Sequence, residues 1–339
     1  MAPNSSSSTT AEKIAAIKQR MTLPVIAAPM FLVSGPDLVI ACCKAGVIGA
    51  FPTLNARPLE ELKRWMERLT GELGSAASER ATAPWAANLI VHRSNPRAAD
   101  DLAMVLQFKP EIVITALGTP RDVVDAVHAY GGLVFADVNS VLYAKKSAAA
   151  GVDGLVLVSA GAGGHTGPLT PFTFVPAVRE FFQGPLAIGG GIVDGRGIRA
   201  VEALGGAFAY IGTRFIATEE SLASGGYRQM LIDSTEEDIQ LTAHFTGVPA
   251  HYLRPSIVRA GLDPTQLGVR AEKKFDSKGD PKSDETKAWR DIWSAGQGVR
   301  SITKVVPAAA LVAELKAGYD ATRSEAGNSE AGNSGAGAA

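Results

Sequence analysis

The feature that most constrains the fold of this chain is a regular alternation of short apolar runs with longer amphipathic ones. Short apolar runs suit strands that are buried on both faces, and longer runs with helical spacing suit helices that cover a sheet. The helices expected between the strands include Arg97–Phe108 and Gly195–Leu204. Eight runs are predicted as strands, namely Pro24–Pro29, Val47–Phe51, Trp85–Val91, Ile112–Ala116, Leu133–Asp137, Gly154–Ser159, Pro185–Ile188 and Phe208–Ile211.

Eight parallel strands, each followed by a helix, are typical of an α/β fold of the (β/α)8 TIM barrel type, which usually takes about 250 residues. The 339 residues of this chain can therefore hold one barrel and an additional segment. A doubly wound open sheet shows the same local alternation, and the strand count favours the barrel over it.

The alternation stops after the eighth strand, and the sequence then becomes richer in charge. We predict that the barrel consists of residues 21–217 and 296–320, including a last helix at Ser301–Ala317. Residues 218–295 are predicted as a small helical insertion that covers the active face. The Ser-rich and Gly/Ala-rich ends, residues 1–20 and 326–339, are predicted to be a disordered leader and tail.

Composition excludes several classes of function. Hydrophobic residues make up 46% of the chain and charged residues 20%, which allows a large core, and the net charge of -1 gives no reason to expect a nucleic-acid or membrane partner. The start has no secretory pattern, and no segment approaches the roughly 20 apolar residues of a membrane span. The adjacent Cys42 and Cys43 suit neither a disulfide framework nor a CxxC pair, so a cytoplasmic location is expected. No metal site is expected, because no His, Cys, Asp and Glu set has ligand spacing.

His165 is the main candidate for a catalytic residue. It lies in the stretch SAGAGGHTG, residues 159–167, directly after the sixth predicted strand. In a barrel the residues that follow the strands line the active face. A neutral imidazole can accept a proton near pH 7, and the surrounding glycines let backbone approach a flat ligand. We therefore interpret His165 as a general base, although a lone histidine is often structural.

Two glycine-rich turns predict a phosphate site. Gly189-Gly190-Gly191 follows the seventh strand, and Gly212-Thr213-Arg214 follows the eighth. Barrels frequently hold a phosphate in the loops after these two strands, with backbone amides as donors. Ordinary tight turns would explain either run alone, whereas their joint position favours a cofactor that carries phosphate.

Two further residues are weaker candidates for cofactor contacts. Asn88 interrupts the apolar third strand, and a buried amide needs a hydrogen-bonding partner. Lys145 follows the fifth strand and could reach a phosphate or a ring carbonyl, although a solvated position on the helix is the simpler interpretation.

These residues together resemble the nitronate monooxygenase family, formerly called 2-nitropropane dioxygenases. The resemblance extends over roughly Leu23 to Lys316, and AGGH is its most specific motif. The motifs that carry it are Ala28-Pro29-Met30, Asn88, Ala162-Gly163-Gly164-His165, the glycines 189 to 191, Gly212-Thr213-Arg214-Phe215 and Ala295-Gly296-Gln297-Gly298.

The resemblance implies an FMN-dependent barrel enzyme that oxidises alkyl nitronates, and nitroalkanes, with O2 to carbonyl compounds and nitrite. It implies that His165 removes the α-proton of a neutral nitroalkane. A small-molecule substrate is expected, and a homodimer is the assembly to be tested. The residues that the resemblance places around FMN are Met30, Asn88, Lys145, Ala162, Gly163, Gly190, Gly191, Gly212, Thr213 and Gln297.

One departure leaves the subgroup open, because many members have Glu directly before AGGH and this chain has Gly161. Related flavin barrels include NAD(P)H:quinone reductases and flavin-dependent enoyl-acyl-carrier-protein reductases, and AGGH alone does not separate them. A more distant alternative is a barrel without redox chemistry that binds a phosphorylated substrate.

Overall fold

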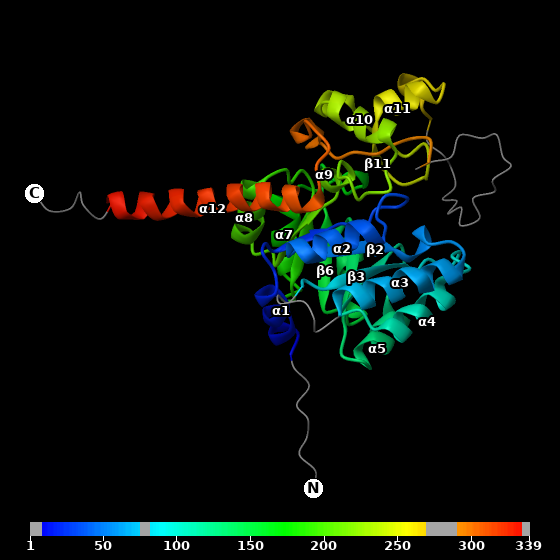
Figure 1. The fold of residues 1–339 in the computed structure, drawn as a ribbon, viewed down its shortest axis with the longest axis vertical. Coiled ribbons are helices and arrows are strands. Elements are labelled where there is room, and N and C mark those ends of the chain that lie inside the picture. The colour runs from blue at the N-terminus through cyan, green and yellow to red at the C-terminus, as the bar shows by residue number, and fades with distance from the viewer. Residues whose placement is uncertain (1–8, 75–81, 269–289, 334–339) are drawn as a thin grey trace, which may run out of the picture.

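A parallel barrel of eight strands forms the body of the molecule (Figure 1). The computed structural model describes residues 9–74, 82–268 and 290–333. The barrel closes where Ile26 of the first strand pairs with Tyr210 of the last. The prediction of a (β/α)8 barrel is therefore confirmed. Its strands are β1 Val25–Ala27, β2 Ile48–Pro52, β3 Trp85–Ile90, β4 Ile112–Ala116, β5 Leu133–Val138, β6 Gly154–Val158, β8 Leu186–Gly189 and β9 Phe208–Ile211.

Helices surround the barrel and pack on its outer face. The strand residues that point outward form one large apolar cluster with the buried faces of these helices. The last helix, α12 Ala308–Asn333, packs between α8 and α2 and so completes the ring. The other helices of the ring are α2 Pro36–Ala45, α3 Leu59–Leu73, α4 Ala98–Phe108, α5 Arg121–His128, α6 Val141–Ala149, α7 Pro171–Arg179 and α8 Gly195–Ala203.

The inward-pointing residues form a second cluster inside the barrel, which includes Ile26, Ile114, Phe135 and Phe208. Because successive side chains of a strand point to opposite faces, every second residue belongs to this interior. Phe135 and Phe208 meet edge to face with ring centroids 6.3 Å apart. The barrel is thus filled by side chains.

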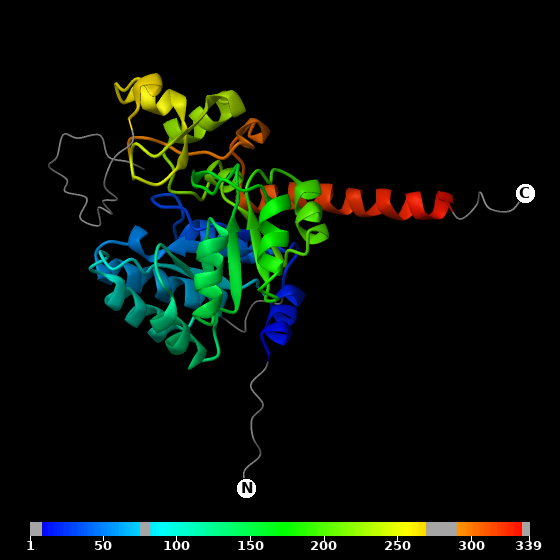
Figure 2. The same ribbon diagram turned by 180° about the vertical axis from the view of Figure 1, so that it is seen from behind.

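A short helix, α1 Thr10–Gln19, closes the end of the barrel where the strands begin (Figure 2). Ile14 and Ile17 are buried in the interior cluster. The prediction of a disordered leader over residues 1–20 is therefore wrong for α1, which is a helix. Residues 1–8 lie outside the described residues. The physical reason is a capping box between Thr9 and Glu12, which starts the helix, together with the two buried isoleucines.

The insertion contains strands as well as helices, which corrects the prediction of a helical insertion. After α9 Thr213–Ile216 and α10 Gly225–Asp233 come β10 Ile239–Thr242, β11 Ala250–Leu253 and α11 Arg254–Arg259. The strands β10 and β11 form a three-stranded antiparallel sheet with β7 Gly164–His165. This pairing across the chain is long-range and has no local signal. In Figures 1 and 2 the insertion lies over the end of the barrel where the strands finish.

The C-terminal helix also differs from its prediction. The predicted helix was Ser301–Ala317, but α12 begins at Ala308 because Val306 bridges to Thr218 in extended conformation and Pro307 precedes the helix. This helix continues to Asn333, past the start of the predicted disordered tail. Residues 334–339 lie outside the description. Among the described helices, none is both long and apolar enough to cross a membrane.

We predict that α1 contributes to the stability of the barrel. Ile17 is only 2% exposed, so Ile17→Ala should lower the free energy of unfolding by about 2 to 4 kcal/mol. Ala16 lies on the exposed face of the same helix, and Ala16→Ser should change this free energy by less than about 0.5 kcal/mol. Urea unfolding followed by circular dichroism measures both. Equal, small effects of the two substitutions would show that α1 is not docked.

Candidate active site

A cavity of about 1820 Å³ opens at the end of the barrel where the strands finish. Ligand pockets for one drug-sized molecule usually measure about 300–1,000 Å³, so this cavity has room for a cofactor and a substrate. Loops after all eight barrel strands and residues of the insertion line it. Nine of the residues predicted for the site are among its lining, namely Met30, Asn88, Ala162, Gly163, His165, Gly190, Gly191, Gly212 and Thr213.

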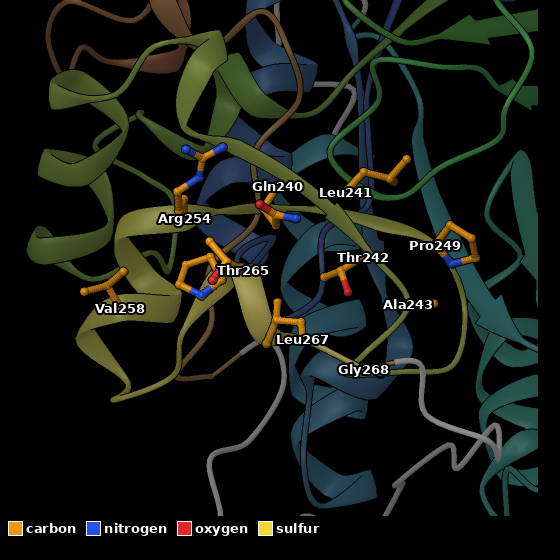
Figure 3. Close-up of a pocket in the computed structure, with 11 residues that line it drawn as sticks. Gln240, Leu241, Thr242, Ala243, Pro249, Arg254, Val258, Thr265, Leu267 and Gly268 are labelled. Carbon is orange, nitrogen blue, oxygen red and sulfur yellow. The ribbon is translucent and has the colours of Figure 1, made fainter.

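A second hollow, of about 740 Å³, lies within the insertion between β10 and α11 (Figure 3). Its walls include Leu241, Arg254 and Val258. Because it contains none of the residues predicted for the site, the cavity at the barrel end is the candidate active site.

The AGGH loop is held against the segment that returns from the insertion. The amide of Gln297 donates to the carbonyl of Gly161 at 3.0 Å. A Cβ atom on Gly163 would lie 2.7 Å from the amide nitrogen of Gly296, so no side chain fits there. Gly161 and Gly164 have φ of 91° and 66°, a region that favours glycine. The small residues of this loop therefore allow two backbone segments to touch at the wall of the cavity.

His165 lies in β7 and faces the cavity from this loop. Its backbone pairs with Ala250 of β11, so the insertion fixes the position of the residue. The ring is half-buried, and its Nε2 atom lies 2.9 Å from Oγ1 of Thr246. The structure thus combines a barrel loop and the insertion around the predicted base.

His251 supports the site from the insertion, although its sequence position is equally compatible with a place on the surface. It is 5% exposed, and its Nδ1 lies 2.7 Å from the carbonyl oxygen of Ala162, so the ring donates to the AGGH loop. The only available signal was its place in the apolar run Ala250–Leu253, where all four residues are buried. Long-range pairing of β11 with β7, which brings His251 opposite Gly164, is not visible in the sequence.

The two predicted phosphate turns lie side by side, because β8 and β9 are neighbours. Gly190 and Gly191 have φ of 127° and 69°, and a Cβ on Gly191 would meet nothing within 4 Å. The Thr213 hydroxyl accepts a hydrogen bond from the amide of Gly296 at 2.9 Å, so its own proton can be donated to a ligand. An exposed glycine backbone beside a hydroxyl donor fits a phosphate group.

Arg214 also lines the cavity, and its guanidinium is held by residues outside the turn. Its guanidinium donates to the carbonyl of Ser301 and to the carboxylate of Glu314, each at 2.6 Å. Since Glu314 belongs to α12, Arg214 joins the start of the insertion to the last helix.

Met30 and Asn88 also line the mouth of the cavity. A Cβ on Gly212 would lie 3.5 Å from the sulfur of Met30, so this side chain borders the turn after β9. The Asn88 amide donates to the carbonyl of Ile114 at 3.0 Å. That bond fixes the amide, whose oxygen can then accept a hydrogen bond from a ligand.

Two predicted cofactor residues lie outside the lining of the cavity. The ammonium group of Lys145 lies 5.3 Å from the ring centroid of Phe181, while Lys146 and Ser147 line the cavity instead. Successive side chains of a helix point in different directions, so Lys145 does not share the direction of Lys146 on α6. The side chain of Gln297 approaches Gly161. A Cβ atom on Gly161 would lie 3.1 Å from Oε1 of Gln297.

Asp137 and Tyr210 form a polar pair at the top of the barrel interior, which the sequence analysis missed. Both line the cavity, and the Tyr210 hydroxyl lies 3.4 Å from Oδ1 of Asp137. Burial raises the pKa of Asp137 to about 7, and the hydrogen bond from Tyr210 opposes this effect. Burial and the neighbouring Asp137 raise the pKa of Tyr210, which therefore remains a neutral donor. Asp137 is thus the lining carboxyl group that changes charge near neutral pH.

The fold and the site define the class of protein. A closed parallel barrel with a large cavity at its C-terminal end, two adjacent glycine-rich turns and a histidine in the wall is typical of a (β/α)8 enzyme. The sequence model of the family described as "Nitronate monooxygenase" matches residues 12–318. The chain belongs to this family, a flavin-dependent group of oxidoreductases that act on nitro compounds.

Similar proteins agree with this assignment. A nitronate monooxygenase of Paraburkholderia phytofirmans is 30% identical over 337 residues, which covers 86% of this chain and 91% of the relative. The structure of a nitroalkane oxidase from Streptomyces ansochromogenes is similar with a TM-score of 0.73 and 26% identity, and covers 91% of this chain and 99% of that chain. The structure of FabK from Thermotoga maritima has a TM-score of 0.73 at 21% identity over 93% and 98% of the two chains, which shows a shared fold.

We predict that Asp137 makes the stability of the folded protein depend on pH. The pKa of its carboxyl is about 7 in the folded chain and about 3.9 in an unfolded one. The folded state therefore binds the proton more tightly, and stability falls as pH rises from about 4 to about 7. Asp137→Asn removes this contribution, so the variant should be at least as stable as the original at about pH 8 and should lose less stability across this window.

Melting temperatures at several pH values measure this difference. Asp153→Asn is the matched control, because Asp153 is partly buried at the opposite end of the barrel and bonds to Thr10 and His128 there. Parallel curves for Asp137→Asn and the original protein would contradict the assignment to Asp137.

Proposed function

We propose that this protein binds FMN in the cavity at the barrel end and oxidises alkyl nitronates, and nitroalkanes after removal of a proton, with O2. The products are a carbonyl compound and nitrite. The observation that carries the proposal is the position of His165 in the wall of the same cavity that contains the phosphate turns. Membership of the nitronate monooxygenase family and the likeness to a nitroalkane oxidase support it.

The residues of the cavity fit a flavin with one terminal phosphate. The backbone of Gly190 and Gly191 and the hydroxyl of Thr213 would hold the phosphate. Met30 and Asn88 would border the ring system, and the open space beside Gly191 accepts a ligand directly against backbone. When bound, the flavin supplies the redox chemistry, and the protein supplies orientation and electrostatics.

His165 would act on the substrate as a general base. A neutral nitroalkane loses its α-proton to the imidazole, and the electron pair of the broken C–H bond moves to the nitro group, which yields a nitronate. A nitronate that enters the site as an anion needs no such step. Apolar lining residues, among them Ile90, Phe245 and Val248, would limit the access of water to the reacting carbon.

We predict that the base is needed for one substrate class more than for the other. His165→Asn removes the basic nitrogen and keeps the size of the side chain. The kcat/KM value for a neutral nitroalkane should fall by about 10²- to 10⁴-fold, with a much smaller loss for the corresponding nitronate. Oxygen consumption with each substrate measures both values.

Equal losses on both substrates would contradict the base role. His128→Asn is the control, because His128 bonds to Asp153 at the other end of the barrel. Anaerobic mixing with NADH or NADPH tests the reductase alternative, since rapid bleaching of the flavin by either nucleotide would contradict the proposed oxidation.

We also predict that Gly163 is required for cofactor binding. Gly163→Ala places a Cβ 2.7 Å from the amide nitrogen of Gly296 and 2.9 Å from the carbonyl carbon of Ala295, so the AGGH loop must move. The variant should retain its fold and bind FMN about tenfold or more weakly. In the control Gly71→Ala, the added Cβ meets nothing within 4 Å on α3.

Absorbance of the purified protein, followed by titration of the cofactor-free protein with FMN, measures the affinity. Heat-released cofactor, identified by mass, should be FMN, and release of FAD would refute that part of the proposal. Undiminished FMN binding by Gly163→Ala would contradict the role of this contact.

A further inference from the structure

Thr246 is the residue of the insertion that contacts the ring of His165. The two residues are 81 positions apart in sequence, and the hydrogen bond of 2.9 Å joins Nε2 of the ring to Oγ1 of the threonine. Thr246 is half-buried and lines the same cavity. The strand pairing of His165 with Ala250 holds the backbone of the histidine, and Thr246 is therefore placed to set the orientation of its ring.

The hydrogen bonds of Thr246 determine the direction of its bond to the ring. Its hydroxyl oxygen lies 3.2 Å from the carbonyl oxygen of Val248 and 3.4 Å from the amide nitrogen of the same residue. A carbonyl oxygen only accepts, and an amide N–H only donates. Since a hydroxyl has one proton, the bond to the Val248 carbonyl uses it. The threonine oxygen must then accept from both the Val248 amide and the imidazole.

We propose that Thr246 is a positioning residue that holds neutral His165 with its proton on Nε2 and its lone pair on Nδ1. This inference rests on the proposed function, in which His165 removes the α-proton of a nitroalkane. The C–H bond of the substrate breaks, its electron pair moves to the nitro group, and the new N–H bond forms at Nδ1. Throughout this step Nε2–H continues to donate to Thr246.

The same contact explains why the step is favourable. A hydrogen bond from an imidazolium is stronger than one from a neutral imidazole, so Thr246 stabilises the product of proton transfer more than the reactant. Thr246 thus links the base to the insertion.

The test compares Thr246→Val, which keeps the shape and loses the hydroxyl, with Thr246→Ser, which keeps the hydroxyl. In the flavin-loaded enzyme, Thr246→Val should reduce kcat/KM for a neutral nitroalkane about tenfold more than for its nitronate. Thr246→Ser should restore the ratio of the two values. The control Thr173→Val removes a hydroxyl that donates to the Thr170 carbonyl on α7, and should leave this ratio unchanged.

A second measurement does not depend on turnover. Nitrogen-15 spectra of the histidine rings, with the His165 signals assigned by comparison with His165→Asn, report which nitrogen carries the proton. The original protein and Thr246→Ser should show Nε2–H, and Thr246→Val should show a mixture of tautomers. Nδ1–H in the original protein, or equal loss on both substrates in Thr246→Val, would overturn the proposal.

The two measurements separate the two proposals. If the original enzyme consumes no oxygen with either substrate, the proposed function is wrong, and the spectra still decide whether Thr246 sets the tautomer. If the enzyme turns over nitroalkanes and the spectra show Nδ1–H, only the role of Thr246 is wrong.

Discussion

The closure of the parallel barrel is the constraint on which the rest of the structure depends. The amide of Ala28 donates to the carbonyl of Ile211 at 2.9 Å, and the amide of Ala209 donates to that of Pro24 at 2.8 Å. These bonds join the first strand to the last. Because all eight strands run in the same direction, their C-terminal ends form one rim. Residues as distant in sequence as Met30 and Thr213 lie together there. Sequence-distant glycines therefore line one cavity.

The insertion completes what the barrel alone cannot provide. The AGGH loop contributes the histidine, but β11 pairs with this loop and His251 donates to its Ala162 carbonyl. The glycines of the loop make it adaptable, and the antiparallel pairing removes that freedom. Precise placement of a catalytic group generally requires such supporting contacts. This wall of the cavity is thus built from two segments that are distant in sequence.

The barrel and much of its rim could be predicted because both depend on local patterns. Each strand has its own apolar run, and position after a strand places residues such as His165 and Gly191 at the rim. The positions of Thr246 and His251 could not be predicted, because they depend on pairing between segments about 80 residues apart. Asp137 was missed because the sequence does not show which strand residues point into the barrel. Lys145 was misplaced because one residue along α6 turns a side chain away from the cavity.

The contact between Thr213 and Gly296 has a consequence for the insertion. These residues flank the insertion, and one hydrogen bond of 2.9 Å joins them across 83 positions of sequence. The ends of the insertion are therefore fixed at the rim, independently of its length. Lengthening a loop with fixed ends costs little free energy, about 0.6 kcal/mol for each doubling. The length of the insertion can thus change while the glycine-rich turns at the rim stay in place.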